Sequence, residues 1–298
     1  MLEAGALRKQ DILSNMLRLA CAVLCSFALS GASHFATLDG HRVHYQSYGQ
    51  GREAVVFIHG WTCDLTFWSG QAPVYEKRRS LLVDLPGHGQ SDKPDIPYTM
   101  ELFARAVEAA MRDAGVDRAT LVGHSMGTPV ALTFLRLYPE KTAGLVVVDA
   151  LIPLPPKDDA EREKVDAMLT ARAKAFRAPD YQVPMRQLLD SMFTAQTAAS
   201  LRDQIRSKML STPQHVAASA MEGMVAMMEQ YRQGFRYPGP ALVVLAKRPN
   251  RSGPTYEAYL RTLFPNLRSY QEWEGAGHFL MMEQPERFNA ALLDFLKR

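Results

Sequence analysis

A serine stands between glycines in the segment GHSMG at residues 123–127. The apolar run before it predicts a buried strand, and residues 128–138 after it predict a helix. A serine on such a tight strand-to-helix turn is exposed for attack on a carbonyl carbon. It also lies at a helix N-terminus, where partial positive charge favours a developing negative charge. This context predicts Ser125 as a nucleophile.

A serine nucleophile needs a base, and the segment GAGHF at residues 275–279 offers one. His278 lies between small residues, after a strand-like run at 268–273 and before a helix-like stretch at 285–297. Small neighbours let such a side chain approach a serine that is distant in the sequence. We therefore predict His278 as the general base.

The segment FIHGW at residues 57–61 follows the strand-like run AVVFI. A loop at this place supplies one backbone N–H of an oxyanion hole, and the residue after the nucleophile supplies the other. The predicted donors are Trp61 and Met126. His59 is a rival candidate for the base, although it precedes the nucleophile in the chain.

Short apolar runs alternate along the chain with stretches in which apolar residues recur at helical spacing. The strands and helices that these patterns predict must position the site. The strand-like runs are 41–48, 54–58, 80–84, 119–123, 144–149, 241–245 and 268–273. Helical periods occur at 100–114, 128–138 and 285–297. Continuous apolar strands separated by helices indicate an α/β fold with a doubly wound, mostly parallel sheet.

The alternation stops between about Pro153 and Pro240, where only helices are predicted, at 158–175, 184–193, 197–210 and 213–231. A helical block between two strands suggests a cap over the carboxyl ends of the strands, where ligands bind in open α/β sheets. We expect a core of 34–153 with 240–298 and a cap at 154–239; a separate helical domain is the alternative. Methionines and phenylalanines recur in the cap, either lining an acyl or aryl pocket or packing the helices. They are Met168, Met185, Met192, Met209, Met221, Met224, Met227, Met228, Phe176 and Phe193.

The N-terminal region resembles an export signal. From Met16 the chain has a basic residue, an apolar run at 19–29 and small residues at 30–33. Cleavage after Ala32 or Ser33 fits, so residues 1–33 are expected to be removed and the protein exported to the periplasm or secreted. The run is too short to span a bilayer. An amphipathic helix, a membrane anchor or a cytoplasmic protein is the alternative.

Composition limits the partners and cofactors. The chain has 298 residues, 47% of them hydrophobic, and a formal charge of +3. No basic run stands out, which argues against nucleic acid. No His/Cys ligand spacing indicates a metal, and the chemistry inferred here needs neither metal nor cofactor. Loss of the signal removes Cys21 and Cys25, so Cys63 remains alone and is expected to be a small core or loop residue.

From about Phe35 to the C-terminus the chain resembles the α/β-hydrolase superfamily, in particular its capped esterase, perhydrolase and C–C hydrolase branch. The resemblance rests on FIHGW, DLPGHGQS at 84–91, GHSMG and GAGHF. It implies a Ser–acid–His triad, a cap inserted between the sixth and seventh strands, no cofactor, and a small-molecule substrate bound under the cap. The DLPGHGQS loop is usually not catalytic in the family.

The acid departs from the common family pattern, which places an Asp just after the strand that follows the cap. Here that strand is followed by KRPNR at 247–251, with the neutral Asn250 at the rough position. The strand before the cap ends in Asp149, where a subset of the family carries its acid. We therefore predict Asp149 as the third triad member.

These residues predict a serine hydrolase that cleaves small to medium apolar carboxylic esters through an acyl-enzyme. The same triad could cleave a C–C bond next to a ketone, open a lactone or amide, or make a peracid. A non-catalytic ligand-binding protein on this scaffold is the alternative outside enzymes, because the usual acid is missing.

Overall fold

The computed structural model describes residues 31–150, 152–232, 234–248 and 253–297, and only the backbone of 228–232. The chain divides into two units, Met1–Ala32 and Ser33–Arg298. The predicted export signal lies almost wholly outside the described residues. Within them, no helix combines the length and the apolar character needed to cross a bilayer.

An eight-stranded sheet forms the centre of the second unit, in the order β1-β2-β4-β3-β5-β6-β7-β8. The strands are β1 (Ala32–Leu38), β2 (His41–Tyr48), β3 (Glu53–Ile58), β4 (Ser80–Val83), β5 (Arg118–His124), β6 (Thr142–Val148), β7 (Ala241–Ala246) and β8 (Leu267–Trp273). β2 is antiparallel to β4, while β3 to β8 pair in parallel. The predicted mostly parallel sheet is therefore confirmed, and β1 is an additional strand.

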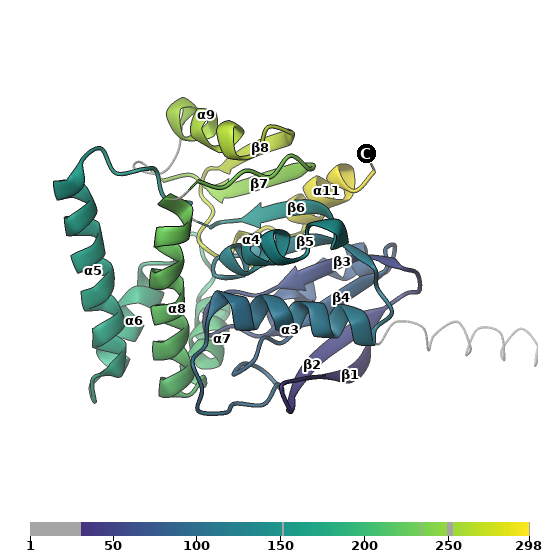
Figure 1. Cartoon of the computed structure of the whole chain (residues 1–298), viewed down its shortest axis with the longest axis horizontal. Coiled ribbons are helices and arrows are strands. Elements are labelled where there is room, and N and C mark those ends of the chain that lie inside the picture. Colours follow the sequence, from purple (N-terminus) through teal and green to yellow (C-terminus); the bar gives the residue numbers. More distant parts are fainter. Residues whose placement is uncertain (1–30, 151, 233, 249–252, 298) are drawn as a thin grey trace, which may run out of the picture. The chain divides into compact units, whose positions relative to one another are not determined.

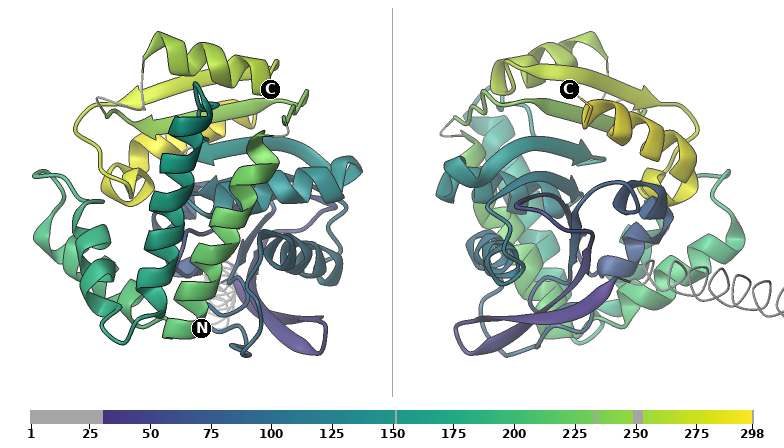
Figure 2. Two further views of the ribbon diagram at one scale, coloured as in Figure 1. Left: turned by 60° about the vertical axis from the view of Figure 1, so that its left-hand side comes forward. Right: turned by 90° about the vertical axis from the view of Figure 1, so that its right-hand side faces the viewer.

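Helices cover both faces of this sheet. On one face lie α3 (Met100–Asp113) and α4 (Gly127–Leu137), and on the other η1 (Leu65–Gln71), α2 (Ala72–Tyr75), α10 (Leu280–Glu283) and α11 (Pro285–Phe295) (Figure 2). The remaining core helices are η2 (Pro139–Lys141) and α9 (Pro254–Leu263). Strands β5, β6 and β7 carry long runs of buried side chains, because helices shield them on both sides.

Between β6 and β7 the chain forms only helices: α5 (Asp159–Arg177), α6 (Gln182–Asp190), α7 (Ala199–Leu210) and α8 (Gln214–Arg232). Their ends fall within three residues of those predicted. Figure 1 shows α5 and α8 side by side next to the strand ends, and an ion pair between Arg177 and Glu222 joins them at 2.7 Å. We call residues 154–239 the helical insert.

The helical insert is hydrogen-bonded to core loops. The indole Nε1 of Trp61 donates to the Ala217 carbonyl at 2.8 Å, and the backbone N–H of Tyr98 donates to the Ser219 hydroxyl at 2.9 Å. Both acceptors lie on α8. The insert and the edge of the sheet are therefore packed as one body.

Candidate active site

Ser125 lies on the turn between β5 and α4, with a backbone φ of +50°, in the left-handed region. Its N–H donates to the carbonyl of Val148 at 3.0 Å, so the serine is fixed beside the end of β6. A Cβ at Gly123 would lie 2.5 Å from the Gly127 carbonyl oxygen, and one at Gly127 would collide with the Ile58 carbonyl. Both glycines are thus required by close backbone packing.

His278 and Asp149 are brought together at the same edge of the sheet. His278 Nδ1 lies 2.6 Å from Asp149 Oδ2, within the expected range for a hydrogen bond. Asp149 is the residue after β6 and also has a left-handed backbone, with φ +39°. Because the carboxylate can only accept, it fixes the proton on Nδ1 and leaves Nε2 as the basic nitrogen.

The pKa of Asp149 lies below its usual value. Burial alone would raise the pKa, but the hydrogen bond and charge of His278, the charge of Arg248 and the backbone N–H of Ala246 outweigh burial. That N–H lies 2.9 Å from Oδ1, and the Arg248 guanidinium lies 3.2 Å from Oδ2. Asp149 is therefore an anion throughout the neutral range.

Two backbone N–H groups beside Ser125 lack a hydrogen-bond acceptor among the described residues, those of Trp61 and Met126. Met126 precedes the first turn of α4, so its N–H belongs to the positive end of that helix. Trp61 precedes Thr62, whose φ of +56° turns the chain sharply after β3. Thr62, Ser125 and Asp149 share a left-handed conformation. Such strain is typical of functional loops.

His59, the rival candidate for the base, has both ring nitrogens occupied. Nδ1 donates to the Gly60 carbonyl at 2.8 Å, and Nε2 accepts from the Leu85 N–H at 3.0 Å. The side chain is buried, and burial lowers its pKa. His59 is consequently a neutral residue that connects two loops and has no free basic nitrogen.

His124 is a neighbour of the site that the sequence analysis did not single out. Its Nε2 donates to the backbone carbonyl of His278 at 2.9 Å, and the two rings lie 4.7 Å apart. Burial, together with the charge of His278, lowers the pKa of His124 to about 3. A neutral His124 therefore holds the loop that carries His278. The sequence feature that could have identified His124 is its position directly before Ser125.

The DLPGHGQS loop is held by its first residue. Asp84 accepts hydrogen bonds from the backbone N–H groups of Leu65 at 2.7 Å and Gln90 at 2.9 Å, and pairs with His44 at 2.7 Å. Burial would raise the pKa of Asp84, but these partners keep it below its usual value. The loop orders the sheet edge and contributes no contact to His278 among the described residues.

The helical insert approaches the site through the stretch after α6. The Met192 carbonyl accepts from the His278 N–H at 2.9 Å, and Phe193 packs on Phe279, with ring centroids 6.0 Å apart. On another side, Phe176 packs against Trp61 at 5.0 Å. The insert thus contributes one backbone hydrogen bond to His278 and two aromatic contacts to its neighbours, Trp61 and Phe279.

Most of the methionines of the insert pack helices together. Met185, Met209, Met221 and Met227 are buried, Met192 and Met224 are partly buried, and Met168 is exposed. The side chain of Met228 lies outside the described residues. The packing alternative therefore accounts for most of this group.

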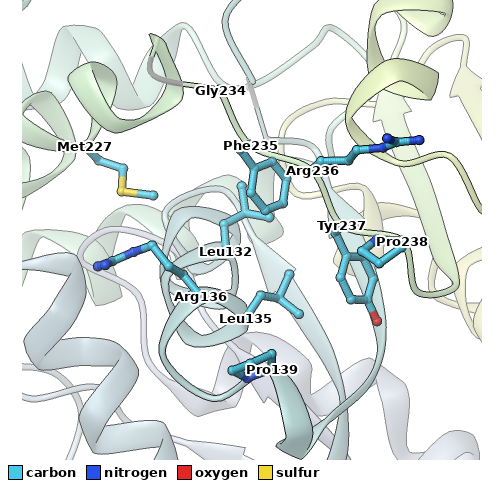
Figure 3. Close-up of a pocket in the computed structure, with 10 residues that line it drawn as sticks. All are labelled: Leu132, Leu135, Arg136, Pro139, Met227, Gly234, Phe235, Arg236, Tyr237 and Pro238. Carbon is cyan, nitrogen blue, oxygen red and sulfur yellow. The ribbon is translucent and has the colours of Figure 1, made fainter.

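A cavity of about 300 Å³ lies away from the catalytic edge, between the second half of α4 and the chain after α8. Leu132, Leu135, Met227 and Phe235 line it, and Figure 3 shows the Arg236 guanidinium directed away from them. Ser125 precedes the opposite end of α4. This apolar cavity is therefore separate from the candidate active site.

No group of three His, Cys, Asp or Glu side chains is arranged to hold a metal within the described ranges. Cys63 is a free, buried thiol, and burial raises its pKa well above the usual value. A thiol of this kind is a poor nucleophile, as expected for a core or loop residue.

A family model described as alpha/beta hydrolase family matches residues 55–291. The chain therefore belongs to the alpha/beta hydrolase family and is a hydrolase. The eight-stranded sheet and its helices are the fold of that family.

Two curated relatives are similar over most of the chain. The 2-hydroxy-6-oxononadienedioate/2-hydroxy-6-oxononatrienedioate hydrolase of Burkholderia vietnamiensis is 30% identical, over 86% of this chain and 91% of that protein. The dihydrolipoyllysine-residue acetyltransferase component of the acetoin cleaving system of Cupriavidus necator is 27% identical, over 88% of this chain and 68% of that protein.

Among solved structures, a thermophilic esterase from Thermogutta terrifontis superposes with a TM-score of 0.74 at 23% identity, covering 89% of this chain and 98% of the other. At this identity the likeness establishes the fold.

Proposed function

We propose that this chain is a serine hydrolase of small to medium apolar carboxylic esters, with Ser125, His278 and Asp149 as its triad. The observation that carries the proposal is the 2.6 Å hydrogen bond between His278 Nδ1 and the buried carboxylate of Asp149, beside a serine in a strained turn. A left-handed backbone at a serine has an energetic cost, and residues strained in this way cluster at functional sites.

In the first step His278 Nε2 takes the proton of the Ser125 hydroxyl while Oγ attacks the ester carbonyl carbon. Asp149 holds the tautomer and stabilises the imidazolium that forms. The oxyanion binds to the N–H groups of Trp61 and Met126, and each such donor is typically worth about 3–4 kcal/mol. His278 then returns the proton to the leaving alcohol, and an acyl-enzyme remains.

In the second step a water molecule replaces the alcohol. His278 removes its proton as the oxygen attacks the acyl carbon, and the same two N–H groups bind the second oxyanion. Collapse of this intermediate releases the carboxylic acid and returns the proton to Ser125. Every proton is carried by side chains of the chain itself.

The substrate class follows from what surrounds the site. The insert places two aromatic side chains against residues next to the site, Phe176 on Trp61 and Phe193 on Phe279. The cation that contacts the triad among the described residues, Arg248, is engaged by Asp149. An apolar acyl or aryl group is therefore favoured over a charged one.

Hydrolysis of a C–C bond next to a ketone is a second candidate, favoured by the 30% identity to the hydrolase of Burkholderia vietnamiensis. The name of that relative's substrate describes a dicarboxylate, for which a site needs free cations. Parallel turnover assays on neutral esters and on vinylogous ketone dicarboxylates separate the two reactions.

The first test is a series of p-nitrophenyl esters of increasing acyl length, assayed beside Ser125→Ala. We expect turnover with a burst of p-nitrophenol, loss of both in the variant, and an optimum at short to medium acyl chains. Equal turnover by the two proteins would remove Ser125 from the reaction.

We propose that the helical insert, residues 154–239, serves as the cap and that residues 34–153 and 240–298 form the core. Support comes from the position of the insert between β6 and β7, and from the contact of Met192 with His278. Exchange of the insert with that of an esterase of different chain-length preference should transfer the preference and leave the burst intact.

We also propose export, on the pattern of residues 16–33 alone. The secreted or periplasmic protein should begin at Ser33 or His34, which intact-mass measurement can establish. A cytoplasmic protein that retains Met1 would contradict this proposal.

A further inference from the structure

Asp149, the acid in the loop after β6, is bound by residues at the end of β7 and directly after it. Asp149 accepts three hydrogen bonds, from His278 at Oδ2, from the Arg248 guanidinium at the same Oδ2, and from the Ala246 N–H at Oδ1. Two of these donors belong to the end of β7 and the residues after it. This is the place where the common family pattern carries its own acid.

Two donors share the Oδ2 oxygen. His278 Nδ1 lies 2.6 Å from it and Arg248 Nη2 lies 3.2 Å from it. The side chains of Asp149 and His278 are almost buried, while that of Arg248 is 30% exposed. A permanent cation thus shares the carboxylate that has to stabilise the imidazolium, and solvent screens it only in part.

Among the described residues, the charged and titratable groups around His278 come from four places. They are Asp149 after β6, Arg248 after β7, His124 at the end of β5, and Glu283 on α10, which accepts from the N–H of Gly277. His124 is neutral at ordinary pH. Arg248 is therefore the one permanent positive charge in this set.

We propose that Arg248 is a positioning residue that clamps the relocated acid, Asp149, in the orientation in which its Oδ2 meets His278 Nδ1. The clamp orients the carboxylate, because a guanidinium donates in a fixed plane. The charge of Arg248 acts on the shared carboxylate, so its removal should make protonation of the Asp149–His278 pair easier. The catalytic meaning of the clamp rests on the proposed function, whereas the contact and its effect on titration do not.

The test compares Arg248→Met, Arg248→Lys and Lys247→Met in the full chain. Lys247 is the matched control, because it is the neighbouring cation but pairs with Glu274 at 2.6 Å, on the exposed side of the loop. For Arg248→Met, we expect the acid limb of the pH profile of kcat/KM on p-nitrophenyl acetate to move up by roughly half to one pH unit. Arg248→Lys should move less, and Lys247→Met should follow the wild type.

A second readout needs no turnover. The Cε1 proton of His278, assigned by its loss in His278→Gln, is titrated by NMR in the wild type and the three variants. An upward shift of the His278 titration in Arg248→Met alone supports the clamp, even if no ester is turned over. Superimposable titrations of wild type and Arg248→Met, or an equal shift in Lys247→Met, overturn it. Absence of Ser125-dependent turnover with a shifted titration would instead refute the proposed function.

Discussion

The edge of the sheet and the helical insert differ in backbone conformation. At the edge, Thr62, Ser125 and Asp149 adopt left-handed conformations in loops fixed by backbone hydrogen bonds. The helices of the insert contain no residue with positive φ among the described positions, and the insert approaches the edge with apolar rings and single hydrogen bonds. The difference supports the proposal that the edge carries out the chemistry, which requires fixed atoms, and that the insert selects substrates.

The largest effect should come from the edge itself. Ser125→Ala is expected to reduce kcat by at least about 10⁴-fold, because triad members act as a unit. The fold should remain, since one hydroxyl is lost at a partly exposed turn. Steady-state kinetics and circular dichroism measure both, and near-normal turnover in a folded variant would show that the edge is not the reaction centre.

Asp149→Asn should have the next largest effect, a loss of about 10⁴-fold in turnover at neutral pH, as is typical for a triad acid. The amide keeps the shape but cannot hold His278 in its productive tautomer. Asp92→Asn, which removes a carboxylate from a surface pair with Arg42, is the control and should remain active.

The alternative position for the acid at this edge is after β7, where Asn250 stands in the sequence but lies outside the described residues. Asn250→Ala should change turnover by less than about tenfold, because the position supplies neither charge nor proton transfer. A loss in Asn250→Ala comparable to that in Asp149→Asn would place the functional acid contact after β7.

The two regions should also differ in their response to acid. Burial lowers the pKa of His88 and His124 to about 3 and also lowers that of His59, whereas the insert carries one histidine, His215. The unfolded chain binds protons below about pH 6.5, while these folded groups do not. Their contribution is complete above that pH and is lost as the pH falls toward 3.

His88 and His124 should each lower the free energy of unfolding by about 2 kcal/mol between pH 6.5 and pH 5. Denaturant titrations at pH 7 and pH 5 measure this loss. His88→Gln should be less sensitive to acid than the wild type, while His41→Gln, at the start of β2, should match it. If the stability of His88→Gln depended on pH as that of the wild type does, His88 would be excluded as a source of the acid sensitivity.

The smallest effect is expected at the junction of the two regions. The Thr212 hydroxyl donates to the Thr62 carbonyl at 3.1 Å and so connects the insert to the loop after β3. Thr212→Val should lower stability by about 1 kcal/mol and kcat/KM by less than about tenfold. Ser211→Ala, which removes a hydroxyl bonded within the insert, should leave kcat/KM unchanged. Identical kinetics in both variants would show that the insert does not support this loop.

Much of the fold could be predicted from local sequence patterns. Continuous apolar runs marked β3 to β7, and helical periods marked the insert, because burial on both faces or on one stripe determines those residues. β1 was missed because most of its side chains are exposed, so its residues show no apolar pattern. α9 was missed although it begins with Pro254 and buries Tyr256 and Leu260 at helical spacing.

The candidate site could be predicted from the sequence only in part. The contact between Asp149 and His278 follows from topology, since both stand at the carboxyl ends of parallel strands, and its prediction is confirmed. The contacts of Arg248 and His124 could not be predicted, because they depend on side-chain direction across neighbouring strands. The catalytic roles of all these residues stay predictions.

The central claim is that Ser125 is a nucleophile activated by His278. A fluorophosphonate probe reacts with such a serine, and mass spectrometry of the digested protein locates the adduct. We predict one adduct, on the peptide that contains Ser125, formed in the wild type and absent from Ser125→Ala and strongly slowed in His278→Gln. A folded wild-type protein that remains unlabelled, or that is labelled at another residue, would contradict the account and favour a protein that binds ligands without turning them over.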